Sequence, residues 1–391
     1  MNKARFCKLI MVAVGKGSAA QSNKYYSMEW DGNSSDFTVK YGRVESTETI
    51  ISKPYYQWDK IYREKVAKGY KDVTDFVSVK VDDTKKDASD TIVKTGAMKV
   101  DEFLDLMQKY TKNLVSQTYS VKATNVTQAQ IDAAQSTLNE IVRLSKVRKI
   151  DIEGVNERLV ELYMTIPRRM DDVRNYLVPS IDVTKSLQQE QDNLDAMASQ
   201  VKMNAKEEKK TTKEVRKTEK TLLDLLGVES IKEIKSSKNI DFLTQQISGR
   251  KIEALFEVDK SSEKDRFDNW LAKQTNKTTK FVYHGTKCTS VIPILQQGLK
   301  IRPSGNFQFS GKAYGNGNYF SDQFSTSIGY TDGGRDNVLL IYEVHTGKES
   351  KSSFNDYSSC KRAGYDSFEG GWLRVAYAEE QAKIKYIIWL K

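Results

Sequence analysis

The hydrophobic pattern of this chain changes twice along its length, and this limits how it can fold. Residues 1–78 contain short apolar runs of the strand type, and residues 94–202 place apolar side chains at helical spacing. From about residue 221 the chain returns to short strands. Because 391 residues usually form two or three domains, these changes predict separate cores. The sequence therefore favours a multidomain protein of the α+β class.

The first segment is predicted to form a small sheet with one helix. In "FTVKYGRV", Phe37, Val39 and Tyr41 alternate with polar residues, which is the period of a half-buried strand. "PYYQWDKIYREKVAKGY" has a helical period, and Gly69 can end that helix. The apolar run Leu9–Val14 is shorter than the core of a signal peptide. We therefore expect it to be the first β-strand.

The middle segment is predicted to be an all-α helical bundle whose apolar stripes form its core. In "NVTQAQIDAAQSTLNEIVRL", Thr127 and Gln130 have the spacing of a capping box before a run of helical period. "KVDEFLDLMQKYTKNLV", "VNERLVELYMTIP" and "SLQQEQDNLDAMASQV" predict three more helices. The polar residues 79–93 and the charged residues 203–220 are expected to be linkers, although a run as basic as the second can also contact DNA.

The composition indicates which partners and which kinds of binding site to expect. Lys and Arg number 62 against 52 Asp and Glu, a net charge of +10 that favours a polyanion such as nucleic acid, or simply a lysine-rich solvated surface. The three cysteines are far apart and the two histidines are isolated, so we expect neither a disulfide framework nor a metal site. No apolar run approaches the length of about 20 residues needed for a membrane span. We expect an intracellular protein without a membrane partner.

The last segment, residues 221–391, is predicted to be an α+β domain with many short strands and one clear helix, "TSVIPILQQGLK". His284 ends the apolar run "KFVYH" and is followed at once by Gly285. In "AYGNGNYFSDQFSTSIGYT", Gly315 and Gly317 either permit a ligand to approach the backbone or form a tight turn. This segment also supplies two aromatic rings and a hydroxyl, a set that suits a flat heteroaromatic amide: Tyr319, Ser327 and Tyr330.

The order and spacing of these motifs carry a resemblance to a known family. "YHGTK", "ILQQGLKIRPSG", "YGNGNYFSDQFSTSIGY", "LLIYEVHTGK" and "AYAEEQAKIKYIIWL" follow one another as in the catalytic domain of the poly(ADP-ribose) polymerases. The likeness covers roughly residues 221–391 and implies a mixed α/β ADP-ribosyltransferase domain with a split antiparallel β core. Residues 94–202 resemble the family's helical regulatory domain, and residues 1–78 resemble its WGR domain, with "YGRV" at the signature.

This resemblance implies an enzyme that cleaves NAD⁺ at the nicotinamide–ribose bond and transfers ADP-ribose to protein or DNA, without a metal. Gly285 would bind the carboxamide through its backbone, Ser327 would add a hydroxyl contact, and Tyr330 would stack on the nicotinamide ring. Tyr319 would line the opposite side, and His284 would hydrogen-bond the adenine-side ribose. The segment Arg302–Lys312 would flank the dinucleotide. The full set of expected NAD⁺-binding residues is His284, Gly285, Thr286, Arg302, Tyr319, Phe320, Ser327 and Tyr330.

One catalytic position departs from the polymerising members. A Glu lies there four residues before the Tyr of the last motif, and the equivalent residue here is Leu373. A leucine cannot accept a hydrogen bond from the nicotinamide ribose, so the resemblance implies transfer of a single ADP-ribose, with a triad of His284, Tyr319 and Leu373. Glu369, Glu379 and Glu380 lie nearby in the sequence, so a polymerase that uses one of these stays an alternative.

The WGR-like segment implies DNA breaks or ends as a partner. Tyr41 replaces the family's Trp but keeps a stacking face, and Arg43 keeps a phosphate-binding fork; a surface edge strand is the structural alternative. DNA would stimulate transfer to protein acceptors, the chain itself among them, in a nucleus or in a bacterial or viral cytoplasm. A catalytically weak or silent DNA-break or NAD-binding module remains open. A dehydrogenase is excluded, because no G-x-G-x-x-G follows an early strand.

Overall fold

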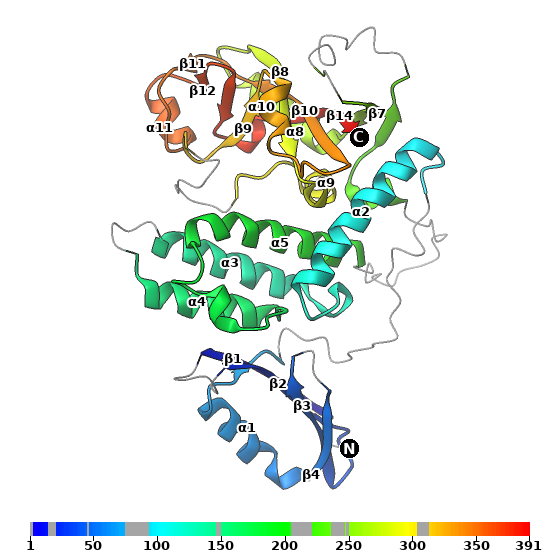
Figure 1. Cartoon of the computed structure of the whole chain (residues 1–391), viewed down its shortest axis with the longest axis vertical. Coiled ribbons are helices and arrows are strands. Elements are labelled where there is room, and N and C mark those ends of the chain that lie inside the picture. Colours follow the sequence, from blue (N-terminus) through cyan, green and yellow to red (C-terminus); the bar gives the residue numbers. More distant parts are fainter. Residues whose placement is uncertain are drawn as a thin grey trace. The chain divides into compact units, whose positions relative to one another are not determined.

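The computed structural model describes residues 3–14, 21–44, 47–74, 94–145, 150–204, 221–235, 247, 250–302 and 313–391 (Figure 1). Contacts divide the chain into two compact units: residues 1–87 with 115–204, and residues 88–114 with 205–391. The linker predicted at 79–93 lies outside the described residues, and so does the one predicted at 203–220 from residue 205 on. Each unit has its own core.

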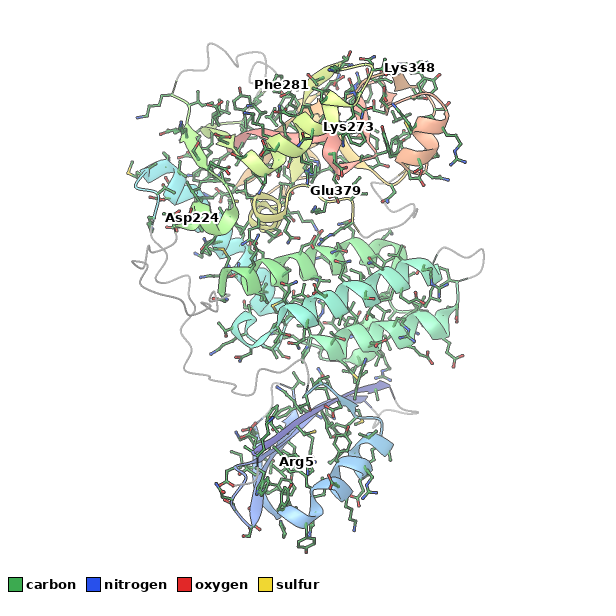
Figure 2. The ribbon with its side chains drawn as sticks, turned by 180° about the vertical axis from the view of Figure 1, so that it is seen from behind. Arg5, Asp224, Lys273, Phe281, Lys348 and Glu379 are labelled. Atoms are coloured by element: carbon green, nitrogen blue, oxygen red, sulfur yellow. The ribbon has the colours of Figure 1, made fainter. Side chains whose placement is uncertain are left out.

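The first unit begins with a five-stranded antiparallel sheet in the order β4-β3-β2-β1-β5. Its strands are β1 (Arg5–Val14), β2 (Gln21–Trp30), β3 (Asp36–Arg43), β4 (Thr49–Pro54) and β5 (Lys71–Asp72). Phe37 and Val39 are buried, which confirms the alternation predicted for β3. Helix α1 (Trp58–Ala67) follows a short 3-10 turn, η1 (Tyr55–Gln57), and buries Trp58 against the sheet. Figure 2 shows Arg5 between the sheet and α1, where its guanidinium lies 4.8 Å from the Trp58 ring.

The four helices predicted in the middle segment are all present. They are α2 (Met98–Thr118), α3 (Gln128–Ser145), α4 (Ile152–Thr165) and α5 (Val183–Asn204), with 3-10 turns η4 (Ala123–Asn125) and η5 (Val173–Tyr176) between them. Helix α3 packs against both α4 and α5 (Figure 1). The capping box is confirmed: the Thr127 amide donates to Gln130 Oε1 at 3.0 Å, and the Gln130 amide donates to Thr127 Oγ1 at 3.3 Å.

Helix α2 differs from the other three in its partners. Up to Leu114 it groups with the second unit. Its Phe103 ring lies 5.1 Å from Phe256 and 5.7 Å from Trp389, and the Tyr110 hydroxyl donates to Asp336 at 3.0 Å. The sequence pattern predicts that the apolar stripe of α2 lies in the core of a helical bundle. Up to Leu114, this stripe instead packs against the C-terminal sheet.

The second unit is built on a nine-stranded sheet in the order β11-β12-β13-β9-β8-β10-β14-β7-β6. Its strands are β6 (Ser230–Glu233), β7 (Ile252–Asp259), β8 (Thr279–Thr286), β9 (Asn318–Ser321), β10 (Asn337–His345), β11 (Glu349–Ser350), β12 (Ser367–Gly370), β13 (Leu373–Ala376) and β14 (Ala382–Leu390). The pairings are antiparallel except between β11 and β12. Because β8 and β9 share only the pair Tyr283 and Ser321, the sheet is split at this junction, as expected.

Several helices cover this sheet (Figure 1). They are α6 (Leu222–Leu226), α8 (Ser261–Ala272), α9 (Cys288–Gln297), α10 (Phe324–Ile328), α11 (Tyr357–Arg362) and the 3-10 turn η6 (Glu379–Gln381). The one clear helix predicted here is confirmed as α9. The pattern misses α8 because "SSEKDRFDNWLA" is mostly polar and buries only Glu263 and Phe267.

The three cysteines, Cys7, Cys288 and Cys360, are buried free thiols. Burial raises the pKa of Cys7 to about 11 and that of Cys360 to about 12, and raises the pKa of Cys288 further. Within the described ranges, no three His, Cys, Asp or Glu side chains come together in a way that could hold a metal ion. No described helix combines the length and apolar character needed to cross a membrane.

We predict that Thr127→Ala lowers the free energy of unfolding of the first unit by about 1 kcal/mol, because the Gln130 amide at the helix N-terminus loses its acceptor, the Thr127 hydroxyl. Urea denaturation followed by far-ultraviolet circular dichroism measures this. Thr127→Ser keeps the hydroxyl and should retain most of the stability. Equal losses in the Ala and Ser variants would show that the cap contributes nothing.

Candidate functional site

Strand β8 ends in the sequence that holds His284 and Gly285. On one side it pairs with β10 along its length, from Thr279 to Thr286. On the other side its pairing with β9 stops at Tyr283. The strand backbone beyond Tyr283 is therefore outside the β9 ladder, and an open strand of this kind can hydrogen-bond a ligand.

The imidazole of His284 is fixed in one tautomer. Its Nδ1 lies 2.9 Å from the backbone oxygen of Tyr319, and because a carbonyl only accepts, Nδ1 carries the proton. Burial lowers the pKa of His284 below its ordinary value, so the ring is neutral at pH 7 and its Nε2 has a free lone pair. Phe320 and Tyr342 pack around the ring at centroid distances of 5.8 and 6.2 Å.

Gly285 is required by packing. A Cβ atom on it would lie 1.7 Å from the backbone oxygen of Ser327 in α10, so no other residue fits. The Ser327 hydroxyl donates to the backbone oxygen of Tyr283 at 3.1 Å, which holds α10 against β8 from the other direction. Ser327 is 4% exposed, and its oxygen can still accept a hydrogen bond from a ligand amide.

The hydroxyl of Tyr319 is fully engaged in the protein. It donates to the Gly315 backbone oxygen at 2.8 Å and accepts from the Tyr314 amide at 2.9 Å. Gly315 has φ +99° and a Cβ there would lie 1.8 Å from the Phe354 oxygen, while a Cβ on Gly317 would lie 2.5 Å from a Val375 methyl. Turn geometry and packing therefore explain both glycines, which favours the tight turn over the approach of a ligand to the backbone.

The other predicted NAD⁺-binding residues lie in different surroundings. The Tyr330 side chain is 58% exposed, and its Cβ would be 3.3 Å from a Cβ on Gly285, so its ring is a free surface beside that glycine. Thr286 and Phe320 are 7% and 2% exposed and belong to the core. Arg302 is half-buried, and the rest of the predicted flanking segment, residues 303–312, lies outside the described residues.

Leu373 on β13 is connected through β9 to the residue before His284. It pairs with Ser321, which in turn pairs with Tyr283. Its half-buried side chain packs against the same buried apolar cluster as that of Tyr319. Glu369 instead pairs with Arg374 and contacts its guanidinium at 3.1 Å.

Glu379 is bound elsewhere. Its carboxylate accepts from the Ile301 amide at 3.0 Å and from Lys300 Nζ at 2.7 Å. Glu380 follows it in η6. Glu369 thus fixes a neighbouring segment through Arg374, and Glu379 fixes another through Lys300 and Ile301.

Sequence reasoning missed a buried charge cluster in the same half-sheet. Arg374 is 7% exposed, and its guanidinium contacts Asp322 at 2.6 Å, Glu349 at 3.0 Å and Glu369 at 3.1 Å. These carboxylates come from the end of β9, from β11 and from β12. The available signal was an arginine inside the otherwise apolar strand "LRVAYA".

The predicted DNA-binding residues belong to the first unit. Tyr41 is half-buried and stacks on Tyr26 with ring centroids 5.7 Å apart. Arg43 is exposed and lies directly opposite Lys24 across the strand pair. Lys65 Nζ lies 3.9 Å from the centroid of the Tyr26 ring, and burial, with a smaller effect from neighbouring lysines, lowers its pKa. The rings of Tyr26 and Tyr41 thus lie in and against the core of this sheet, and the positive charges of Lys24, Arg43 and Lys65 lie beside them.

Comparison with known proteins relates the second unit to one family. Residues 229–372 match the poly(ADP-ribose) polymerase catalytic domain. A poly(ADP-ribose) polymerase-like protein, 100L, of Invertebrate iridescent virus 6 is 38% identical over 178 residues, which is 41% of this chain and 98% of that protein. Protein 101L of the same virus is 38% identical over 236 residues, or 60% of this chain and 91% of its own length.

A plant enzyme shares a shorter region. Poly(ADP-ribose) polymerase 2 of Arabidopsis thaliana is 34% identical over 111 residues, 28% of this chain and 17% of that enzyme. The matched catalytic domain includes the segment with His284, Gly285, Tyr319, Ser327 and Tyr330. With one polymerase-like relative covered almost from end to end at 38% identity, the chain belongs to the poly(ADP-ribose) polymerase family.

Proposed function

We propose that this protein cleaves NAD⁺ at the nicotinamide–ribose bond and transfers a single ADP-ribose to a protein or DNA acceptor, and that DNA breaks stimulate the reaction. The observation that carries the proposal is the open end of β8, where His284 and Gly285 leave the ladder with β9. The catalytic-domain match over residues 229–372 supports NAD⁺ as the substrate.

The nicotinamide would lie beside Gly285. The backbone amide and carbonyl of that residue would bind the carboxamide, and Ser327 would accept a hydrogen bond from the carboxamide N–H. The exposed ring of Tyr330 would stack on the base, with Tyr319 on the other side. His284, neutral and with Nδ1 occupied by the Tyr319 carbonyl, would use the lone pair of Nε2 to accept from a hydroxyl of the adenine-side ribose.

This set of contacts suits the chemistry. Cleavage of the glycosidic bond passes through a cationic, oxocarbenium-like state, so orientation and electrostatic support contribute more than a strong nucleophile. Nicotinamide leaves as a neutral molecule and needs no proton donor. Holding its amide on a rigid strand end fixes the leaving group while the ribose carbon moves toward the acceptor.

We predict that Gly285→Ala lowers kcat/KM for NAD⁺ about hundredfold, because the new methyl displaces the Ser327 backbone and with it the nicotinamide contacts. Release of labelled nicotinamide and transfer of labelled ADP-ribose measure this. Gly334→Ala is the control, since a Cβ there meets nothing within 4 Å. If the wild-type protein transfers no label with or without DNA, the proposal fails, and NAD⁺ binding without turnover would favour a silent module.

Transfer of a single unit is supported by Leu373. Its side chain lies in an apolar cluster with Tyr319, and Glu369 pairs with Arg374 rather than facing that cluster. A growing chain needs a carboxylate to polarise the hydroxyl that attacks next, and leucine provides none.

We therefore predict that the wild-type protein forms products carrying one ADP-ribose, and that Leu373→Glu forms longer chains, because the new side chain supplies the carboxylate that leucine lacks at this position. Denaturing gels and mass spectrometry of the labelled products measure chain length. Leu373→Gln, which is polar but uncharged, should stay at one unit. Long ladders from the wild-type protein would contradict the proposal.

The regulatory part of the proposal concerns the N-terminal part of the chain, residues 1–202. We infer that its five-stranded sheet with α1 acts as a WGR-like DNA-binding domain and that the helices of residues 94–202 regulate access of NAD⁺. The opposed positive charges of Lys24 and Arg43 support this, because like charges directly opposite each other in a sheet are unfavourable unless an anion binds there. The half-buried ring of Tyr41, backed by the buried Tyr26, would add a stacking contact.

We predict that Arg43→Ala weakens binding to nicked or broken duplex DNA and reduces the slope of log affinity against log salt by about one, because one phosphate contact is lost. DNA-stimulated transfer should fall in parallel. Lys60→Ala on α1 removes an exposed charge elsewhere and serves as the control. An unchanged salt slope in Arg43→Ala would remove Arg43 from the DNA-binding surface.

A further inference from the structure

A group of polar side chains is buried beside His284, and the proposed reaction does not use it. Glu263 and Arg266 come from α8, Gln296 from α9 and Tyr342 from β10; together they form what we call the polar layer. The Tyr342 ring meets the His284 imidazole edge to face, at 6.2 Å and 86°. One member of the polar layer, Tyr342, is thus in direct ring contact with the imidazole.

The polar layer contains hydrogen-bonding atoms without partners. Among the described residues, nothing pairs with Glu263 Oε1, Arg266 Nε, the Tyr342 hydroxyl or either end of the Gln296 amide. Glu263, Gln296 and Tyr342 are only 2%, 6% and 1% exposed. Bulk water therefore does not reach these atoms from an open surface.

Contacts of Glu263 link α8 to the strand pair of Tyr342 and to the end of α9. Glu263 Oε2 accepts from the Ile384 amide at 3.0 Å, and Ile384 is the strand partner of Tyr342 at a β-bulge in β14. A Cβ on Gly298 would lie 3.0 Å from Glu263 Oε1 and 3.6 Å from Arg266 Nη2. Gly298 directly ends α9, whose last turn holds Gln296.

The border of the polar layer is also defined. Arg266 donates to the backbone oxygen of Glu379 at 3.3 Å, and Lys260 Nζ donates to the backbone oxygen of Leu295. Figure 2 shows Glu379 close to the end of α9. The charges of Glu263 and Arg266 both act on the Tyr342 hydroxyl, although burial is the main cause of its raised pKa.

Five unpaired buried polar atoms would together cost a free energy comparable with the stability of a whole domain. Buried water that makes two to four hydrogen bonds is the usual way in which proteins satisfy such groups. We propose that a cluster of ordered waters links Tyr342, Glu263, Arg266 and Gln296, and that this hydrated layer makes Tyr342 and Glu263 positioning residues for His284.

The positioning follows from ring packing. A hydroxyl held by water fixes the plane of the Tyr342 ring, and that ring, with Phe320 at 5.5 Å, fixes the plane of the imidazole. Two contacts then fix the direction in which Nε2 points: the ring of Tyr342, and the Tyr319 carbonyl that accepts from Nδ1. The inference rests on the proposed role of His284 in binding NAD⁺, but its tests below include measurements made without NAD⁺.

A crystal structure of the unliganded full chain provides the direct test. We expect ordered waters within hydrogen-bond distance of the Tyr342 hydroxyl, Glu263 Oε1 and the Gln296 amide. Well-ordered side chains with no water density between them, or direct pairing of these atoms with one another, would overturn the hydrated layer. This measurement is independent of any enzymatic activity.

Histidine NMR tests the positioning. The chain has only two histidines, so a sample labelled in histidine gives one imidazole from the site and one from His345, which is held by Trp270 and Asn276. In Tyr342→Phe we expect the His284 signals to shift or broaden and those of His345 to stay in place. Tyr386→Phe, which removes a hydroxyl from β14, is the matched control. Unchanged His284 signals in Tyr342→Phe would refute the positioning role.

Kinetics and a second pair of variants complete the test. If His284 binds the ribose, KM for NAD⁺ should rise about tenfold in Tyr342→Phe with a smaller change in kcat. Glu263→Gln keeps an acceptor for the Ile384 amide and should behave like the wild type, whereas Glu263→Leu should reproduce the Tyr342→Phe signals. Equal behaviour of the Gln and Leu variants would contradict the role of Glu263. Failure of the kinetic effect alone, with the NMR shift present, would locate the error in the proposed NAD⁺ contact.

Discussion

The catalytic unit depends on a single strand pair, Tyr283 with Ser321, that joins two half-sheets. This pair joins β9 to β8, while on the β9 side the backbone of His284 and Gly285 lies beyond the ladder. Gly285 completes the arrangement because only its missing side chain lets α10 lie against the open strand.

Much of this could be predicted from local sequence signals. A histidine at the end of an apolar run, the spacing of the glycines and tyrosines, and the capping box of α3 all depend on residues close to one another in the chain. The predicted helices of the middle segment and the strand β1 follow from periodicity in the same way. For these elements the local pattern and the final packing agree.

The features that escaped prediction depend on distant partners. Helix α8 is mostly polar, and its one buried acid, Glu263, makes sense only beside Ile384 more than a hundred residues away. Helix α2 carries an ordinary amphipathic stripe, and nothing in that stripe tells whether helices or a C-terminal sheet will cover it. Arg374 is a single charge in an apolar strand, and its three carboxylates come from three other segments. Periodicity reports which face is buried, not what buries it.

Buried charge gives the two half-sheets different characters. Around Arg374, three carboxylates surround one buried guanidinium. Burying these charges costs free energy unless every partner is in place. The cluster therefore favours one register of β12, β13 and β9 over registers shifted by a residue. The half-sheet with β10 and β14 is held instead by apolar packing around Leu339, Ile341 and Ile388. The half-sheet that carries Leu373 is thus held by ion pairs, and the half-sheet that carries His284 is held by apolar packing. The two are joined by the pair Tyr283 and Ser321.

The buried thiols have a consequence for the chemistry of this chain. With pKa values raised by burial, Cys7, Cys288 and Cys360 hold almost no thiolate at neutral pH, and the thiolate is the form that reacts. The folded protein should therefore be insensitive to mild oxidants and to alkylating reagents. Any ADP-ribose that the chain places on itself would have to be attached through oxygen or nitrogen, in a bond whose stability to hydroxylamine or acid differs from that of a thioglycoside.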